Sequence, residues 1–520
     1  MSEQMSELFD SLPAYLGGHM LLSITALAAA LAISLPLGIV ASRRPKLAES
    51  ALAIAGVIQT IPSLALLALM MLVLGGLIGF WPAFLALVLY SILPIVANTI
   101  VGIRGVDPAM TEAARGLGMS DRQMLWQVQL PLASPVILGG IRTATVLVVG
   151  TATLATPVGG TSLGNYIFAG IATLNHVSTL FGCVAAALLA VGLDQLVHLL
   201  EIAARRRSRS LAYVAAAGLL LVIAGGLYGP VNRWVSDDKP AVIASAAFTE
   251  QYVMSHALSQ KLEAAGFKSE RREGMGYGIQ LMALKRNDVD CLVIYTGDIW
   301  TLLMKRRDFA DPETTLAEVT RFLHDEFGGV VCLGKLGFEN AYAVAIAKDL
   351  ATTIAKDHAK EVEKLSIEDL ARHADRLGRP LKVGGDIAVF QRKEWQGLKE
   401  QYRFPSKVQP IAMDQSLMYA AVAKGELDAI IAYSSDGRIR AFELKVIGDP
   451  QHVFPPYDAI LLLSPSAAKR PGFREALLPL LDSINQEAIQ DANGRVDIEQ
   501  QSPKQVAGWL LKAIEKGDRR

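Results

Sequence analysis

The residues of this 520-residue chain that could perform chemistry do not assemble into a catalytic motif. Gly329–Lys335 has the spacing of a phosphate-binding loop, but Leu336 stands where that loop needs Ser or Thr. We find no His and Glu spacing typical of a metal site, and no paired nucleophile and base. Asp194 and His198 lie one helical turn apart in an apolar stretch, where an interfacial pair close to a basic loop is favoured over a functional site. We therefore predict no enzyme activity, no metal and no cofactor.

The cysteines add no clear redox chemistry. Cys183 lies in an apolar stretch, whereas Cys291 and Cys332 lie in the polar half of the chain. An oxidising compartment would permit a bridge between the latter two, but the sequence does not place them close enough to pair. Two reduced core thiols are the favoured interpretation.

Composition divides the chain into two parts. Hydrophobic residues make up 52% of the sequence, and the mean hydropathy of +0.33 is too high for an ordinary soluble enzyme. The formal net charge is zero, which gives no electrostatic case for a nucleic-acid partner. Residues 1 to about 235 are dominated by aliphatic residues and glycine, whereas charged residues are frequent from Asp237 onward. We predict one domain over residues 1–232 and a second over residues 240–520.

The first domain contains apolar stretches long enough to cross a bilayer, which takes about 20 residues of helix. Six such stretches predict an all-α membrane bundle, and they lie at about residues 20–41, 51–74, 82–103, 133–157, 178–200 and 211–230. The first is not a cleavable signal peptide, because it lacks a basic leading region and is followed by further spans.

Basic residues orient these spans. The segments that follow spans one, three and five carry the lysine and arginine clusters, which include Arg43, Arg115 and Arg205–Arg207. The alternate segments, about 1–19, 75–81 and 158–177, contain neither residue type. Since basic residues stay on the cytoplasmic side, the N-terminus should lie outside and six crossings should return the chain to the outside. The second domain is therefore predicted to be extracytoplasmic.

One of the cytoplasmic segments carries a sharp motif. It reads Glu112-Ala113-Ala114-Arg115-Gly116-Leu117-Gly118 and continues to Leu130-Pro131. This segment resembles the EAA loop of ABC-importer permeases, through which a separate ATPase moves the membrane bundle. The resemblance implies ATPase-coupling roles for Glu112, Ala113, Ala114 and Gly118. The alternative is an ordinary amphipathic loop between spans.

The second domain alternates strand and helix signals. Residues 242–246, 291–295, 341–346 and 429–433 are strand-like, and a helix is expected over 250–265. Repeated strand–helix units favour parallel sheets. The length suits an α/β domain of two lobes, like a periplasmic binding protein, that closes over its ligand by a hinge motion.

Several stretches of this domain resemble the substrate-binding proteins of glycine betaine, carnitine and choline ABC transporters. They are Phe248-Thr249-Glu250-Gln251, Tyr295-Thr296-Gly297, Gly337-Phe338-Glu339-Asn340-Ala341-Tyr342-Ala343, Ala432-Tyr433-Ser434-Ser435-Asp436-Gly437-Arg438-Ile439 and Phe454-Pro455-Pro456-Tyr457-Asp458. The first domain is similar to the permease partners of the same transporters, so the resemblance covers most of the chain. Fused chains of this kind occur in the family.

The resemblance implies an aromatic cage for a quaternary ammonium, which has no proton to donate and is held by aromatic faces. By motif, the cage residues would be Tyr295, Tyr342, Tyr433 and Tyr457, although each tyrosine alone could simply pack a lobe. Arg392 aligns with an arginine that binds the ligand carboxylate, a task suited to a guanidinium. Its alternative is a surface arginine.

Departures from the family pattern leave the ligand open. Ala246 stands where the family often has a lysine, and Asp298 follows Gly297 where the family has threonine. Asp298 would repel a ligand carboxylate but could pair with a cation or accept a hydrogen bond from a ring N–H. Choline, glycine betaine, carnitine and ergothioneine therefore all remain candidates, and related fused transporters are associated with ergothioneine.

The predicted function is import through the bacterial inner membrane by a permease that carries its own receptor. Its predicted partners are a separate ABC ATPase, the lipid bilayer, a quaternary-amine or betaine-like solute and a second copy of the chain. One alternative is a ligand-binding membrane sensor, but the cytoplasmic segments are short loops with no output domain. Another is a membrane-anchored enzyme, for which we find no nucleophile and base.

Overall fold

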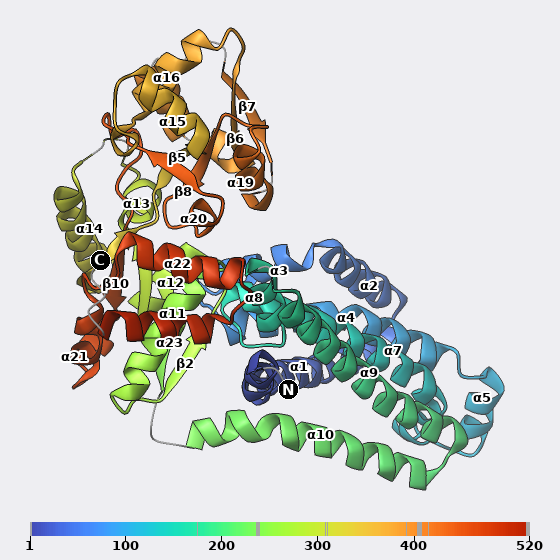
Figure 1. Ribbon diagram of the computed structural model, residues 1–520. Helices are drawn as coiled ribbons and strands as arrows, with labels where there is room; N and C mark the ends of the chain where they lie inside the picture. The colour runs from blue at the N-terminus through green and yellow to red at the C-terminus, as the bar shows by residue number, and fades with distance from the viewer. Residues whose placement is uncertain are drawn as a thin grey trace. The chain divides into compact units, whose positions relative to one another are not determined.

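The computed structural model describes residues 3–173, 175–235, 240–306, 308, 310–391, 393–402, 408–413 and 415–515. The chain forms two compact units, residues 1–239 with 272–279, and residues 240–271 with 280–520. Residues before 236 form helices, and the strands of the chain follow from residue 241 onward (Figure 1). Each unit is described below by itself.

The helices of the first unit form a bundle. They are α1 (Glu3–Ser42), α2 (Pro45–Thr60), α3 (Ser63–Val73), α4 (Phe80–Arg104), α5 (Pro108–Gly116), α6 (Asp121–Met124), a π-helical turn (Leu125–Gln129), α7 (Leu130–Ala152), a 3-10 turn (Thr153–Val158), α8 (Gly164–Ala172), α9 (His176–Arg206) and α10 (Arg209–Val235). Within the described residues, five helical segments are long and apolar enough to cross a membrane, or six if the bent pair α2 and α3 counts as one. The predicted all-α bundle is confirmed.

The predicted span over residues 51–74 is not one straight helix. The axes of α2 and α3 differ by 104° across the break between Thr60 and Ser63. Pro62 cannot donate to the preceding turn, and the residue before a proline avoids the helical region. Ile61 accordingly has an extended ψ of 127°. The proline therefore divides this span into two helices.

Small residues let the spanning helices approach closely. A Cβ on Gly38 of α1 would lie 2.6 Å from the Cβ of Thr99 in α4. A Cβ on Gly140 of α7 would lie 2.5 Å from the Cβ of Asn98 in α4. Helices in a bilayer gain from this close packing because lipid offers no hydrophobic drive between them.

The helix ends show how the chain passes through the bundle. Arg104, the last residue of α4, donates from Nε to the carbonyl oxygen of Ser42 at the end of α1, at 2.9 Å. Because these two helices end together, they run in the same direction. The segment between them, α2 and α3, therefore returns the chain along the bundle.

At the opposite end of the bundle, the start of α4 lies beside the segment that follows α7. The N–H of Gly79, before α4, donates to the carbonyl oxygen of Val158, after α7, at 2.7 Å. A Cβ on Gly226, late in α10, would lie 2.4 Å from the sulfur of Met20 in the first half of α1. The last helix of the bundle therefore returns to the level of the first half of α1.

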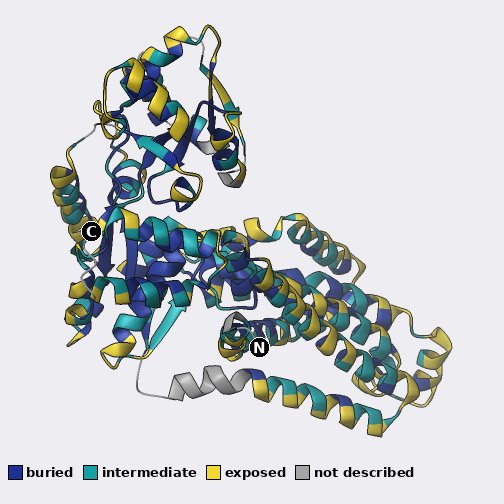
Figure 2. Cartoon of the chain, viewed as in Figure 1, coloured by how far each residue is buried: buried dark blue, intermediate teal, exposed yellow. Residues whose placement is uncertain are grey.

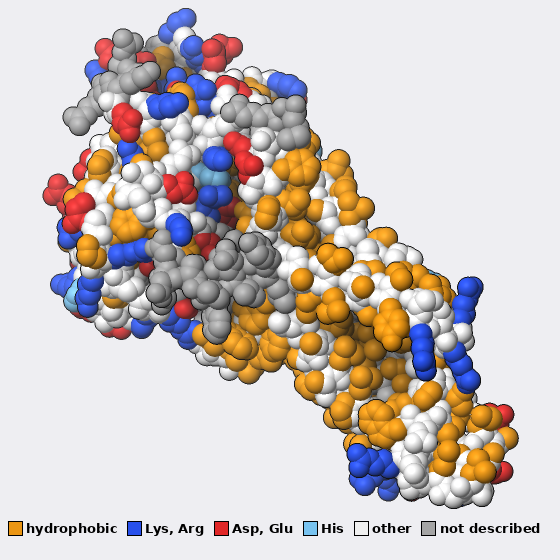
Figure 3. All heavy atoms as spheres, turned by 90° about the horizontal axis from the view of Figure 1, so that it is seen from below, with side chains coloured by type: hydrophobic (Ala, Val, Ile, Leu, Met, Phe, Trp, Pro, Cys, Tyr) orange, Lys and Arg blue, Asp and Glu red, His pale blue; other side chains and the backbone are white. Residues whose placement is uncertain are grey.

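The outer surface of the bundle is apolar. Figure 3 shows hydrophobic side chains covering its visible face, with lysine and arginine side chains gathered at one end. Exposed residues on different helices include Leu72, Leu188 and Leu221. Such a surface suits lipid rather than water.

The second unit contains two five-stranded sheets with the orders β2-β1-β3-β10-β4 and β7-β6-β8-β5-β9. The strands are β1 (Ala241–Ala244), β2 (Ser269–Arg272), β3 (Cys291–Tyr295), β4 (Val331–Glu339), β5 (Tyr342–Ala347), β6 (Leu381–Gly385), β7 (Val408–Ala412), β8 (Ala429–Tyr433), β9 (Leu444–Ile447) and β10 (Asp458–Leu463). Two sheets confirm the predicted two-lobed α/β fold.

The expectation of parallel sheets is confirmed only in part, because both sheets are mixed: β1 pairs parallel with β3, and β6 with β7 and β8. β10 pairs antiparallel with β3 and β4, and β5 pairs antiparallel with β8 and β9. Because β4 and β5 belong to different sheets, residues 340–341 carry the chain from the first lobe to the second. Residues 448–457, between β9 and β10, carry it back. A strand that enters a sheet directly from the other lobe, rather than through a crossover helix, can pair antiparallel.

Helices cover both sheets. They are α11 (Thr249–Ala264), α12 (Tyr277–Lys285), α13 (Thr296–Asp298), α14 (Pro312–Glu326), α15 (Lys348–Asp357), α16 (Ile367–Arg376), α17 (Ile387–Gln391), α18 (Lys393–Gln401), α19 (Gln415–Ala423), α20 (Arg438–Ala441), α21 (Phe473–Leu477), α22 (Gln486–Asp497) and α23 (Pro503–Glu515). Figure 2 shows the central strands, such as β3 and β8, largely buried among these helices, whereas the edge strands β2 and β7 are not. In β5, Val344 and Ile346 face one core of the second lobe, whereas Ala345 faces another.

Candidate functional site

Two of the predicted cage tyrosines meet in the second lobe. Tyr342 and Tyr433 are directly opposite in the β5–β8 ladder, their ring centroids lie 4.8 Å apart, and their hydroxyl oxygens lie 3.0 Å apart. The ring of Phe454, from the returning crossing segment, has its centroid 6.4 Å from that of Tyr342. The ladder register thus creates a cluster of aromatic rings beside both crossing segments.

The other two tyrosines belong to the first lobe. Tyr295 ends β3 and is 1% exposed. Its hydroxyl group donates to a carboxylate oxygen of Glu250 and accepts from Nε2 of Gln251 at 3.2 Å. The ring of Tyr457 lies against Gly297, where a Cβ would come within 2.6 Å of the ring carbons. The described contacts therefore place the four tyrosines in two groups, one in each lobe.

A cavity of about 510 Å³ opens between the lobes. It is lined by Ala310, Asp311, Pro312, Glu339, Ala341, Tyr342, Ala343, Val344, Ile367, Ser434, Val446, Ile447, Gly448, Asp449, His452, Phe454, Pro455 and Pro456. Tyr342 is the predicted cage residue that lines it, together with Phe454. Both crossing segments contribute to this lining, so a hinge motion of the lobes would reshape the cavity.

The cavity wall is acidic. Burial raises the pKa of Glu339, and Asp458 adds to this effect while Lys335 opposes it. Hydrogen bonds from Thr314 hold the pKa of Asp311 below its usual value. The described lining also contains Asp449 but no lysine or arginine. Aromatic rings and carboxylates in one cavity favour a cationic ligand over an anionic one.

One side of the cavity is fixed by Tyr402. Its hydroxyl group donates to Asp449 and accepts from the backbone N–H of Gln451 at 2.9 Å. The second carboxylate oxygen of Asp449 accepts from the N–H of Phe454, also at 2.9 Å. These bonds fold the returning segment and hold Phe454 at the cavity wall. Sequence reasoning missed this set, although Phe454 lies in a quoted motif.

Glu250 joins both lobes. It is buried, and its Oε2 accepts from Nδ2 of Asn493 at 3.2 Å, while Ser435, Asn340 and Tyr295 also donate to the carboxylate. Burial raises the pKa of Glu250. The sequence identified Glu250 only as part of a motif, because its partners lie in four separate segments.

The described contacts do not test the roles predicted for Asp298 and Arg392. Asp298 ends α13 and is half-buried beside Gly297. Arg392 lies outside the described residues. Their predicted ligand contacts stay predictions.

The EAA-like segment forms short, exposed helices at one end of the bundle. Asp107 caps α5 by accepting from the N–H of Ala109 at 2.9 Å. Gly118 has φ +78°, which a glycine adopts without strain and which ends the helix. Leu117 and Trp126 are 80% and 62% exposed, so the segment presents apolar side chains to a partner.

The predicted coupling residues differ in exposure. Glu112, Ala113 and Gly118 are exposed, whereas Ala114 is buried. Arg43, after α1, lies 3.4 Å from the carbonyl oxygen of Asp121 and links the segment to the bundle. A force on α5 would therefore reach the ends of spanning helices.

Both halves of the chain match transport-protein families. The substrate-binding domain of ABC-type glycine betaine transport systems matches residues 239–513, and the inner membrane component of binding-protein-dependent transport systems matches residues 34–234. The protein is therefore a multi-pass permease subunit of an ABC importer, fused to its substrate-binding domain. The chain belongs to the glycine betaine-type ABC transporter family.

Curated relatives agree with this assignment. The chain is 32% identical over 497 residues to the ergothioneine transport permease/ergothioneine binding protein EgtU of Helicobacter pylori strain G27, covering 92% of this chain and 86% of the relative. It is 41% identical over 183 residues to the choline transport system permease protein OpuBB of Bacillus subtilis strain 168, covering 35% of this chain and 83% of the relative.

A solved structure also matches. A glycine betaine/carnitine/choline ABC transporter structure has 26% identity and a TM-score of 0.48, covering 54% of this chain and 100% of that chain. The matched families are transport families, in agreement with the importer prediction and not with the sensor alternative.

Proposed function

We propose that this chain imports a quaternary-ammonium or betaine-type solute, such as choline, glycine betaine, carnitine or ergothioneine. The observation that carries the proposal is the acidic cavity between the lobes, with Tyr342 and Phe454 in its wall. Trimethylammonium groups are held by aromatic faces, at about 0.5–2 kcal/mol each, and by carboxylates. The names of the ergothioneine and choline relatives support the same class of solute.

In this proposal Tyr342 and Tyr433 form the aromatic wall in the second lobe, and Tyr295 and Tyr457 belong to the facing lobe. Asp298 would pair with the cationic group of the solute or accept a hydrogen bond from a ring N–H, and Arg392 would bind a solute carboxylate. The membrane domain comprises residues 1–232 and the receptor domain residues 240–520. Lobe closure would bring the two aromatic groups together around the solute.

The receptor domain is proposed to lie outside the cytoplasm of a bacterial cell. Arg43 and Arg104 lie at the bundle end where α1 and α4 finish, and Arg205–Arg207 lie at and just after the end of α9. Basic residues favour the cytoplasmic side. The return of α10 to the level of Met20 supports an even number of crossings. A cysteine-accessibility assay on intact cells should label the receptor domain from outside, and protection there would contradict this orientation.

A separate ABC ATPase is proposed to dock on the EAA-like segment, and two copies of the chain to form one transporter. Leu117→Asp should abolish solute uptake while leaving solute affinity unchanged, because Leu117 is exposed and makes no core contact. Uptake at the original rate would exclude this docking surface. Cross-linking of the purified complex would test whether one transporter contains two copies of the chain.

Isothermal titration of the full-length chain in nanodiscs tests the solute class. At least one of choline, glycine betaine, carnitine and ergothioneine should bind, and Tyr342→Ala should weaken it about 30-fold, as expected for one lost cation–π contact of about 2 kcal/mol. Tyr419→Phe is the matched control. It removes a buried tyrosine hydroxyl that donates to Asp436 at 2.7 Å in the same lobe, away from the cavity lining. Equal affinities of the two variants would contradict the proposed site.

A further inference from the structure

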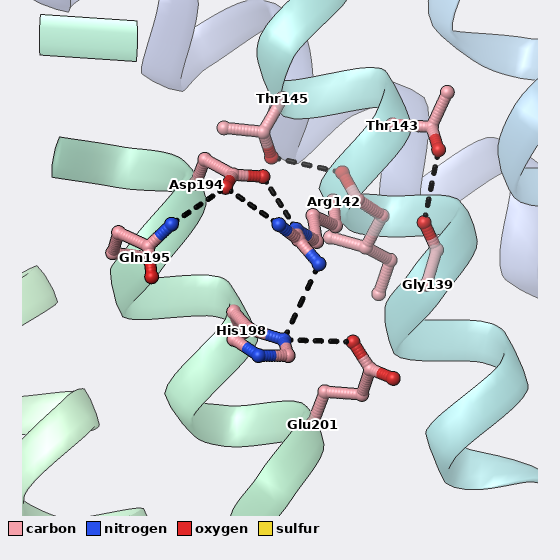
Figure 4. A network of polar contacts seen from close by, with 9 residues as sticks. Gly139, Arg142, Thr143, Thr145, Asp194, Gln195, His198 and Glu201 are labelled. Atoms are coloured by element: carbon pink, nitrogen blue, oxygen red, sulfur yellow. Dashed lines mark hydrogen bonds and ion pairs between the residues drawn. The ribbon is translucent and has the colours of Figure 1, made fainter. Parts of the chain in front are cut away.

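A network of charged side chains joins α7 and α9 on the surface of the bundle (Figure 4). The guanidinium of Arg142 donates from Nε and Nη2 to the two carboxylate oxygens of Asp194, at 2.5 and 2.8 Å. Sequence reasoning placed Asp194 and His198 together near the basic loop, whereas the structure gives Asp194 a partner on another helix. The arginine was missed because 52 positions separate it from Asp194.

One ring nitrogen of His198 lies within hydrogen-bonding distance of two side chains. Nδ1 of His198 lies 3.3 Å from Nη1 of Arg142 and 3.2 Å from Oε2 of Glu201. The first neighbour is a donor and the second an acceptor, so this nitrogen can hydrogen-bond to only one of them at a time. The network can therefore change partners without moving a helix.

The ion pair lies deep within the spans. Arg142 is 12 residues after Leu130 and 10 before Ala152, which corresponds to about 18 and 15 Å along α7. Asp194 is 12 residues before Arg206, again about 18 Å along α9. The hydrocarbon core of a bilayer is about 30 Å thick, so these distances are comparable with half of its thickness.

This part of the bundle surface is polar at a depth where its surroundings are apolar. The side chains of Arg142 and His198 are 35% and 36% exposed, and Thr143 and Gln195 beside them are exposed. Nε2 of Gln195 also donates to Asp194 at 3.2 Å. Charged side chains at the bilayer centre face a protein interior or water rather than lipid. The exposed side of the pair therefore belongs on a hydrated path.

We propose that Arg142 and Asp194 form a second solute site, inside the membrane, on the path through the bundle. Asp194 would receive the trimethylammonium group, and Arg142 the carboxylate of a zwitterionic solute. Between solutes the two side chains pair with each other. The assignment rests on the proposed function only for the class of solute.

Arg142 and Asp194 can exchange each other for a zwitterionic solute, and such an exchange suits a site inside the membrane. A bare carboxylate or guanidinium at mid-membrane would be strongly unfavourable, whereas a pair that opens toward a zwitterion leaves neither charge unpaired. A trimethylammonium group offers no hydrogen bond, so the charge of Asp194 is what attracts it. His198 can accept from Arg142 while Asp194 is engaged, which keeps the guanidinium in place.

Thiol labelling of the full chain in nanodiscs tests whether this surface faces water. In a Cys183→Ser background, Gln195→Cys should react at least ten-fold faster than Leu221→Cys with a trimethylammonium-ethyl thiosulfonate. Leu221 is the matched control, because it is exposed on α10 and lies about 18 Å along its helix from Arg209, at a comparable depth. Equal slow labelling of both cysteines would overturn the proposal, whether lipid or a second copy covers the surface.

Charge variants then separate a solute site from a structural ion pair. In the Gln195→Cys chain, Asp194→Asn should slow the cationic reagent at least three-fold relative to an anionic sulfonatoethyl reagent. Arg142→Gln should change the ratio in the opposite direction, and Thr143→Ala should leave it unchanged. An unchanged ratio in both charge variants would assign the pair to helix packing alone. These rates are read without any solute, so the outcome does not depend on whether choline or a betaine binds the receptor domain.

Discussion

Asp194 in the bundle and Glu250 in the binding unit are carboxyl groups that the fold holds in opposite ways. Asp194 lies against a guanidinium, with both oxygens engaged at 2.5 and 2.8 Å. Glu250 is 2% exposed, and its described hydrogen-bond partners are all neutral: Tyr295, Asn340, Ser435 and Asn493. The first group is held by an opposite charge, and the second by dipoles.

The difference matches what each region does. A paired charge remains available to a charged solute, because the pair can open when another charge replaces one member. A carboxyl group whose pKa is raised by burial holds its proton more readily and acts as a hydrogen-bonding junction. Glu250 can therefore tie the two lobes together without competing with the cavity carboxylates for a cationic solute.

Removing one member of the ion pair should give the largest effect. Asp194→Ala leaves Arg142 without its partner, and we expect a loss of about 2–3 kcal/mol, below the 3–5 kcal/mol of a fully buried pair because Arg142 is partly exposed. Thermal unfolding in nanodiscs would measure it. The double variant Arg142→Ala with Asp194→Ala should recover at least half of the loss. Strictly additive losses would show that the two charges are not coupled.

A pH-dependent effect that reaches a similar size only at its upper limit is expected at Asp497, which belongs to the same junction. Its Oδ1 accepts from the hydroxyl group of Thr249 at 2.5 Å. Burial raises the pKa of Asp497 from 3.8 to about 6, with Asp436 adding to the rise and Thr249 and Arg438 opposing it. The folded chain then binds the proton more tightly than the unfolded chain. The stabilisation that the protonated Asp497 contributes is therefore complete below about pH 4. It decreases as the pH rises toward 6, by about 3 kcal/mol at most.

The Asp497→Asn variant isolates this contribution. Relative to the original chain, it should gain stability between pH 4 and pH 7 in thermal unfolding of the full chain. Asp491→Asn is the control, since Asp491 lies on the same helix but is exposed and pairs with Arg440. A constant difference across the pH range would mean that Asp497 is not held protonated.

Much of the fold could be predicted from local patterns. Residues 291–295 and 429–433 are strands, and the helix expected over 250–265 covers Thr249–Ala264. Apolar runs and period-two patterns lie within single elements, so they can be recognised without the third dimension. The bend at Pro62 has a local cause as well, but an apolar run that continues across it masks the break.

The sites could be predicted only in part, because their contacts join distant segments. The motif tyrosines were found, but their division between two lobes follows from sheet pairing, as for Tyr342 and Tyr433 at a separation of 91 positions. The partners of Glu250 include Asn493, 243 positions away. The acidic cavity lining combines Asp311 with Asp449, which no sequence motif connects.

The smallest effect is expected from replacing the carboxyl group of Glu250 by an amide. If Glu250 is protonated in the folded chain, Glu250→Gln preserves its shape and its charge state, and its single amide oxygen can take the place of Oε2, which accepts from Asn493. We expect a change below about 1 kcal/mol in thermal unfolding at pH 7, within the range of a single neutral hydrogen bond. Asp194→Asn makes the same atomic change beside the guanidinium of Arg142, which then loses its charged partner. It should therefore lower the free energy of unfolding by more than Glu250→Gln does. A larger loss for Glu250→Gln than for Asp194→Asn would show that Glu250 is ionised, and the contrast between the two regions would then be wrong.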